Sequence, residues 1–114
     1  MALPALPIPP EELARSLSRA LGGRSAGPAL TVTEPGLVRT PDEPGFGLRL
    51  TVDVDGGAGG AGETWRVTIP VDPIDLEPDV SPSALVTVLR ANIEEWWDRK
   101  ADEPRLASWG HRVE

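Results

Sequence analysis

S-P-S-A-L-V-T-V-L-R-A-N-I-E-E-W-W-D-R-K, residues 81–100, is the stretch that decides the fold. Ser81 is a favourable N-cap, because its hydroxyl accepts a hydrogen bond from a free amide of the first helical turn. Pro82 suits the first helical position, where no N–H is needed. The last two residues of the stretch are basic, which matches the negative end of the helix dipole. The stretch therefore predicts a helix that is about 30 Å long.

Apolar residues recur at three- and four-residue steps through this helix and predict one buried face. Trp96 and Trp97 lie about 100° apart around the helix, so both border that face without both being fully buried. Asn92 falls on the same face, either as a hydrogen-bonded core group or as part of an interface. The apolar members of the face are Leu85, Val88, Leu89, Ile93, Trp96 and Trp97.

Two stretches of strict alternation, residues 46–55 and 64–71, predict a β-hairpin. Each has an apolar side chain at every second position and mostly polar side chains between, the pattern of half-buried antiparallel strands. The segment that joins them is rich in glycine and too long for a tight turn. The apolar faces consist of Phe46, Leu48, Leu50, Val52 and Val54 on the first strand and Trp65, Val67, Ile69 and Val71 on the second.

Two shorter elements precede the hairpin. Residues 10–21 predict a helix with acidic residues in its first turn and glycines after its end, and residues 29–34 alternate as a short strand. Residues 35–45 carry prolines and glycines and predict a loop, with an extended piece around Leu37 and Val38.

The predicted element order is α-β-β-β-α. We expect a single small α+β domain with a three-stranded antiparallel sheet and both helices packed on one face. The chain divides into a proline-rich N-terminal arm at residues 1–9, the domain itself at residues 10–103 and a C-terminal tail at residues 104–114.

The amino-acid composition excludes or disfavours several classes of function. The chain has 114 residues, enough for one core, and no cysteine, which excludes disulfides and thiolate chemistry. The net charge is −7, and the stretch from Asp42 to Asp79 accounts for all of it, with nine acidic residues against two arginines. An acidic middle disfavours nucleic-acid binding, which needs a basic surface. With no long apolar run for a membrane span, we expect a cytoplasmic protein.

Asp53, Asp55 and Glu63 flank the glycine-rich segment, and the D-x-D-G spacing suggests a calcium loop. An EF-hand loop needs a bidentate carboxylate at its twelfth position. A loop that starts at Thr51 has Gly62 there instead. These acids therefore favour a solubilising role over a metal site, and we expect no cofactor.

Catalytic groups are scarce in the sequence. His111 is the sole histidine, and the chain has neither cysteine nor tyrosine. A dyad of His111 with Ser81 or Ser108 would depend on tertiary geometry. The glycine-rich segment has no lysine beside it and leads to a strand, so it lacks the features of a phosphate-binding loop. No catalytic residue is predicted, and an enzyme is disfavoured.

The residues left for an interaction surface are tryptophans and acids. Trp109 stands in the C-terminal tail, as a partner-binding anchor or as a cap that folds back on the core. The connector that begins at Asp72 is acidic and rich in proline, which suits docking to a basic partner. The candidate interaction residues are Trp96, Trp97, Trp109, Asn92, Asp72, Asp75 and Glu77.

We therefore expect a non-catalytic protein-interaction or assembly protein, either a small adaptor or a homo-oligomeric component. Unpaired sheet edges would let a partner or a second copy add a strand. One alternative is a nucleic-acid module, because α-β-β-β-α is the element order of double-stranded-RNA-binding domains. Another is a divalent-metal-binding protein that uses the acids of the hairpin tip.

Overall fold

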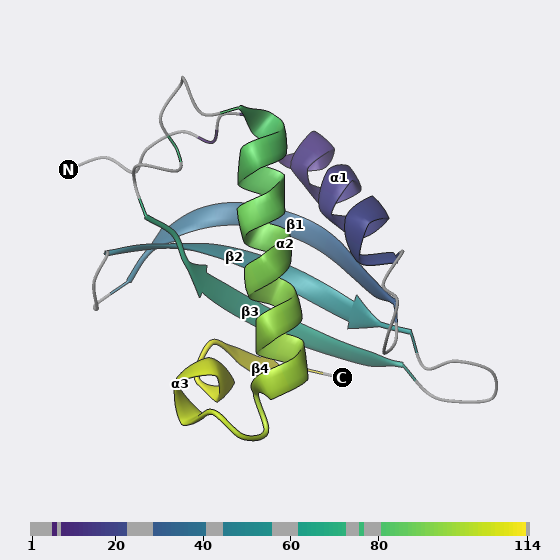
Figure 1. Ribbon diagram of the computed structural model, residues 1–114, viewed down its shortest axis with the longest axis vertical. Helices are drawn as coiled ribbons and strands as arrows, with labels where there is room; N and C mark the ends of the chain where they lie inside the picture. Colours follow the sequence, from purple (N-terminus) through teal and green to yellow (C-terminus); the bar gives the residue numbers. More distant parts are fainter. Residues whose placement is uncertain are drawn as a thin grey trace.

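The computed structural model of the chain describes residues 6, 8–22, 29–40, 45–55, 62–72, 76 and 81–113. These residues form an α+β fold with an antiparallel sheet, which confirms the predicted class (Figure 1). In chain order the elements are α1 (Pro10–Gly22), β1 (Leu30–Arg39), β2 (Phe46–Val54), β3 (Glu63–Pro70), α2 (Pro82–Arg99), α3 (Pro104–Ala107) and β4 (Gly110–Arg112).

The sheet has four strands in the order β1-β2-β3-β4, so the prediction of three strands is wrong. The fourth strand, β4, pairs antiparallel with β3, with Arg66 opposite His111. It comes from the stretch that the sequence indicated as a tail. Three residues are too few to show the alternation that identifies a strand, and β4 forms because its neighbours hold it against β3.

Helix α2 begins as predicted. The Ser81 hydroxyl accepts a hydrogen bond from the Ala84 amide at 3.2 Å, and Pro82 occupies the first position of the helix. Val88 differs from the prediction, because its side chain is 40% exposed and lies outside the buried face. That face is narrower than the sequence pattern and consists of Leu85, Leu89, Ile93 and Trp96.

Strand β1 is longer than predicted, because a β-bulge carries it past the residues that indicated a loop. Thr33 pairs with Thr51 and Gly36 with Arg49, so two residues of β1 face one residue of β2. The first of the two, Glu34, has a φ of 53°, a left-handed conformation that is unusual outside glycine. The second is Pro35, which is buried.

The bulge predicts a stabilising substitution. Glu34→Gly is expected to raise the free energy of unfolding by about 0.5–1 kcal/mol, because the left-handed conformation strains an L-residue more than the added flexibility of glycine costs. Chemical denaturation of the purified protein measures the change. Thr33→Gly is the matched control in the same strand and is expected to lower the free energy by about 0.5–1 kcal/mol. A loss of stability in Glu34→Gly would contradict the strain.

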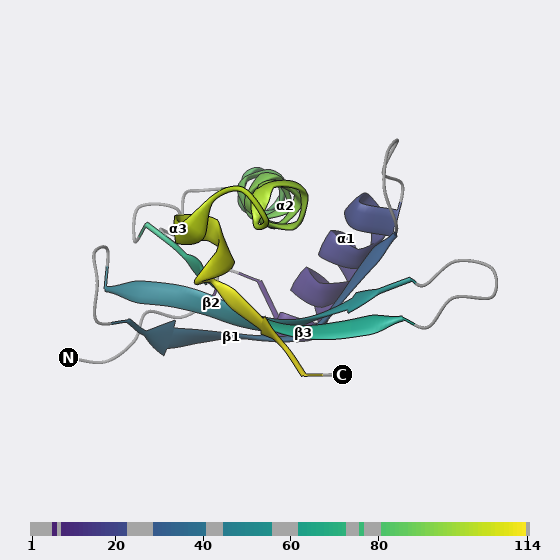
Figure 2. The same ribbon diagram turned by 90° about the horizontal axis from the view of Figure 1, so that it is seen from below.

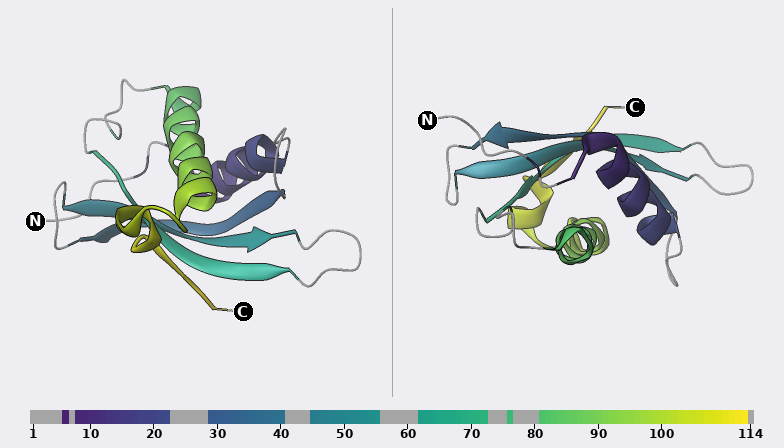
Figure 3. Two further views of the ribbon diagram at one scale, coloured as in Figure 1. Left: turned by 60° about the horizontal axis from the view of Figure 1, so that its bottom comes forward. Right: turned by 90° about the horizontal axis from the view of Figure 1, so that it is seen from above.

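The helices and the sheet form two layers. Figure 2 shows α1, α2 and α3 on one side of the sheet, with the other side open, and the two views in Figure 3 agree. The core lies between the layers, and the described buried side chains are all apolar. Leu6 and Ile8, from the predicted N-terminal arm, pack against it.

Candidate functional site

A basin of about 950 Å³ lies on the open face of the sheet and extends to its β4 edge. Its floor comes from outward-facing residues of β2 and β3, and its wall from α3, the turn that follows it and β4. The lining mixes arginine side chains with hydroxyl groups and one indole, and its described residues include no carboxylate. The lining residues are Thr40, Arg49, Arg66, Thr68, Pro70, Arg105, Ser108, Trp109, His111 and Val113.

Strand register brings three basic side chains of the basin together. Arg66 of β3 lies directly opposite His111 of β4. Arg49 of β2 is opposite Thr68, two residues along β3 from Arg66, so the two arginines are diagonal neighbours on one face. Such neighbours have Cα atoms about 7–8 Å apart, within reach of arginine side chains. The basic residues therefore form a diagonal across three adjacent strands.

One acid, Asp53, is a diagonal neighbour of Arg66 on the same face of the sheet, but its carboxylate accepts a hydrogen bond from the Thr64 hydroxyl. Among the described residues, no hydrogen bond or ion pair joins the side chains of Arg49, Arg66 or His111 to another residue. The Nε of Arg66 is shielded from solvent without a hydrogen-bond acceptor in the described part of the chain. The two neighbouring guanidinium groups repel one another, and an orphan buried donor also costs stability. This arrangement is unfavourable for folding alone and suits an anionic ligand.

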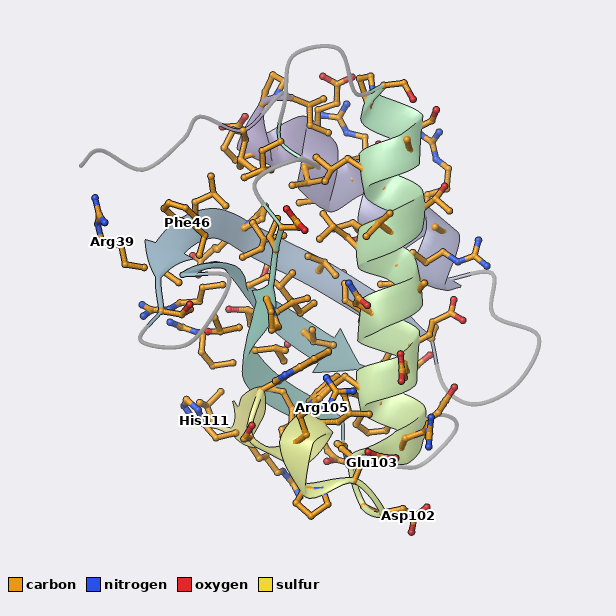
Figure 4. All side chains as sticks on the ribbon, turned by 60° about the vertical axis from the view of Figure 1, so that its left-hand side comes forward. Arg39, Phe46, Asp102, Glu103, Arg105 and His111 are labelled. Atoms are coloured by element: carbon orange, nitrogen blue, oxygen red, sulfur yellow. The ribbon has the colours of Figure 1, made fainter. Side chains whose placement is uncertain are left out.

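The wall of the basin is anchored in the core by Leu106 of α3, which is fully buried. The next turn presents Trp109 to the basin, and the Arg105 guanidinium lies 5.5 Å from the centre of its ring. The Trp109 carbonyl accepts a hydrogen bond of 2.7 Å from the Thr68 amide, which fixes the wall to the floor. Figure 4 shows His111 pointing away from the helices, toward the open side of the sheet.

A cluster of three tryptophans lies behind the basin, on the helix side of the sheet. Trp96 is fully buried, and the ring centres of Trp65 and Trp97 lie 5.4 Å and 5.9 Å from that of Trp96. The ammonium of Lys100 lies 4.8 Å from the Trp65 ring centre and 4.5 Å from the Trp97 ring centre. These are cation–π distances, so the cluster has its own cation and functions as packing.

The predicted tryptophans therefore differ in their surroundings. Trp96 belongs to the core, Trp97 is half-buried in the cluster, and Trp109 both packs against the core and lines the basin. Asn92 is half-buried on α2. Asp72 is exposed after β3, whereas Asp75 and Glu77 lie outside the described residues.

The acids of the hairpin tip do not converge. Asp53 pairs with Thr64 and Val54 with Glu63, so Asp53 and Glu63 lie on opposite faces of the sheet. Asp53 accepts a hydrogen bond of 2.8 Å from the Thr64 hydroxyl, and Glu63 accepts one of 3.1 Å from the Trp65 indole. Within the described ranges, no three acidic or histidine side chains are grouped to hold a metal ion.

Sequence reasoning missed the arginines of the basin. Alternation placed Arg49 and Arg66 on the polar face of the hairpin, which indicated only solvent exposure. Their meeting with Arg105 and His111 depends on α3 and β4, which carry no periodic signal. The absence of acids between residues 64 and 71, in an otherwise acidic middle of the chain, was the one signal available.

In the described part of the chain, no helix has the length and apolar character needed to span a membrane. Comparison of the chain with protein families, with curated protein sequences and with solved structures finds no match.

Proposed function

We propose that the protein is a non-catalytic interaction protein that binds an acidic segment of a partner protein in the basin. The observation that carries the proposal is the basic diagonal of Arg49, Arg66 and His111, which has no acidic residue beside it among the described residues that line the basin, although the chain is strongly acidic. Complementary charge on a partner would remove the repulsion within the diagonal and would select for acidic segments.

The open face supports this proposal better than the sheet edges do. Adding a strand to an edge requires a run of free backbone N–H and C=O groups. On β1 the bulge with Pro35 interrupts that run. On the other side β4 covers part of β3, and the remaining edge ends at Pro70, which has no N–H. Side-chain recognition on the face therefore fits the fold better than strand addition.

The exposed surface supports a separate partner more than obligate self-assembly. Among the described residues, the large apolar side chains that are exposed are Val88 and Val113. Val88 belongs to α2, and Val113 directly follows β4. Obligate dimers bury wide apolar interfaces, whereas a polar basin suits a partner that binds and leaves.

Titration with a fluorescently labelled polyglutamate peptide at low ionic strength tests the proposal. The wild-type protein is expected to bind it, and Arg49→Gln/Arg66→Gln to bind about 100-fold more weakly. Each lost charge-assisted hydrogen bond is worth about 1.5–3 kcal/mol, or about tenfold or more in affinity. The variant is expected to melt at the same or a higher temperature, because it removes like-charge repulsion.

Arg15→Gln/Arg19→Gln is the matched control. It changes the net charge equally but alters exposed residues of α1, on the helix side of the sheet, and it is expected to bind like the wild type. Equal loss of binding in both double variants would refute a specific basin. Salt-dependent binding of duplex RNA without binding of polyglutamate would instead favour the nucleic-acid alternative.

A further inference from the structure

We infer that the basin recognises one phosphoryl group, carried by a phosphoserine or phosphothreonine of the acidic partner segment. This inference rests on the proposed function and names the chemistry of the bound segment. Among the described residues, the lining of this open basin supplies three arginines and one histidine and no carboxylate. A compact ligand with a high charge is the natural complement to that arrangement.

The number of donors favours phosphate over carboxylate. Arg49, Arg66 and Arg105 all line the basin, and each guanidinium carries five N–H donors and no acceptor. A carboxylate offers two oxygens and a single charge. A phosphate monoester offers three oxygens and a charge of about −1.5 to −2 at neutral pH. Its oxygens therefore satisfy more of these donors at one point, with the bidentate geometry that guanidinium groups provide.

The floor of the basin is organised before any ligand arrives. The Nε of Arg66 is shielded from solvent, so this side chain lies against the sheet and does not extend freely into water. His111 lies opposite it on β4, and the Thr68 hydroxyl stands two positions along β3 on the same face. Groups that are already restricted lose little conformational entropy on binding, which suits recognition of a small group.

The extent of the basic surface argues against a nucleic acid as the ligand. A nucleic-acid strand places a negative charge at every nucleotide and needs a basic track that follows it. Here the basic diagonal ends within the basin. Farther along the outward face of β2, toward the hairpin tip, lies the carboxylate of Asp53. A single phosphoryl group needs only the basin, so it avoids repulsion from the rest of the acidic chain.

The test compares three forms of one short, otherwise neutral peptide, with serine, glutamate or phosphoserine at its centre. Fluorescence anisotropy with the full chain is expected to give an affinity for the phosphoserine form at least about tenfold above that for the glutamate form. Arg66→Gln is expected to weaken binding of the phosphoserine peptide about tenfold or more, while Arg15→Gln/Arg19→Gln leaves it unchanged. A thermal melt shows that each variant is folded.

Three other outcomes would each contradict a different part of the inference. Equal affinity for the glutamate and phosphoserine peptides would show a general carboxylate site, which leaves the proposed function intact. Inorganic phosphate that binds as tightly as the phosphopeptide would assign the basin to free phosphate compounds and not to a protein segment. Failure of the phosphopeptide and of polyglutamate together would refute both the inference and the proposed function.

Discussion

Trp96→Ala is expected to lower the free energy of unfolding by about 3–5 kcal/mol, the usual cost of removing a fully buried aromatic side chain. Trp96 has no exposed surface and contacts two other tryptophans, with ring centres 5.4 Å and 5.9 Å away. Small domains have about 5–15 kcal/mol of stability in total, so this variant is expected to be close to unfolding. Urea denaturation followed by circular dichroism measures the loss.

Trp96→Phe separates ring packing from the indole N–H. The Nε1 of Trp96 is buried without a hydrogen-bond acceptor among the described residues, so removal of this donor relieves a penalty. We expect a loss of about 1–2 kcal/mol, because the phenyl ring retains most of the contacts. A loss below about 1 kcal/mol in Trp96→Ala would show that this side chain is not part of the core.

Leu106→Ala is expected to lower the free energy of unfolding by about 2–5 kcal/mol and to release the wall of the basin. Leu106 is the buried residue of α3, and the strand that follows is only three residues long. Without this anchor, the hydrogen bonds from the Thr68 amide to the Trp109 carbonyl and from the Val113 amide to the Thr64 carbonyl are expected to open. Hydrogen exchange of these two amides measures the release.

Val113→Ala is the matched control in the same segment. Its side chain is 47% exposed, so the expected change is within about 0.5 kcal/mol. Protection of the Thr68 amide in Leu106→Ala at the wild-type level would show that β4 holds its place without α3. In that case the pairing of β4 with β3, where Arg66 lies opposite His111, would hold β4 in place more strongly than the packing of α3 does.

The elements that the sequence predicted well are those with local signals. Helix α2 has its cap at Ser81 and its proline at Pro82, and both function as expected. The hairpin alternates over nine residues in β2 and eight in β3, enough to fix which face is buried. In both cases the signal lies within the element itself, so no tertiary information is needed.

The elements that the sequence missed depend on contacts between distant segments. Strand β1 continues past Pro35 only because β2 accepts a bulge there. Strand β4 forms because β3 has a free edge and because the buried Leu106 fixes the segment that precedes β4. The basin also depends on contacts between distant segments. Arg49 and Arg66 come from the predicted hairpin, whereas Arg105 and His111 come from the unpredicted segment.

The position of Lys100 has a chemical consequence, because it is the sole lysine of the chain. The chain therefore has one side-chain amine, and two indole rings cover it at 4.8 Å and 4.5 Å. Acylation there removes the charge and with it both cation–π contacts. An amine-reactive reagent thus labels the ε-amine at a rate that reports how often the end of α2 separates from the rings, and after proteolysis the labelled peptide that holds Lys100 is distinguished from the one that holds the N-terminal amine.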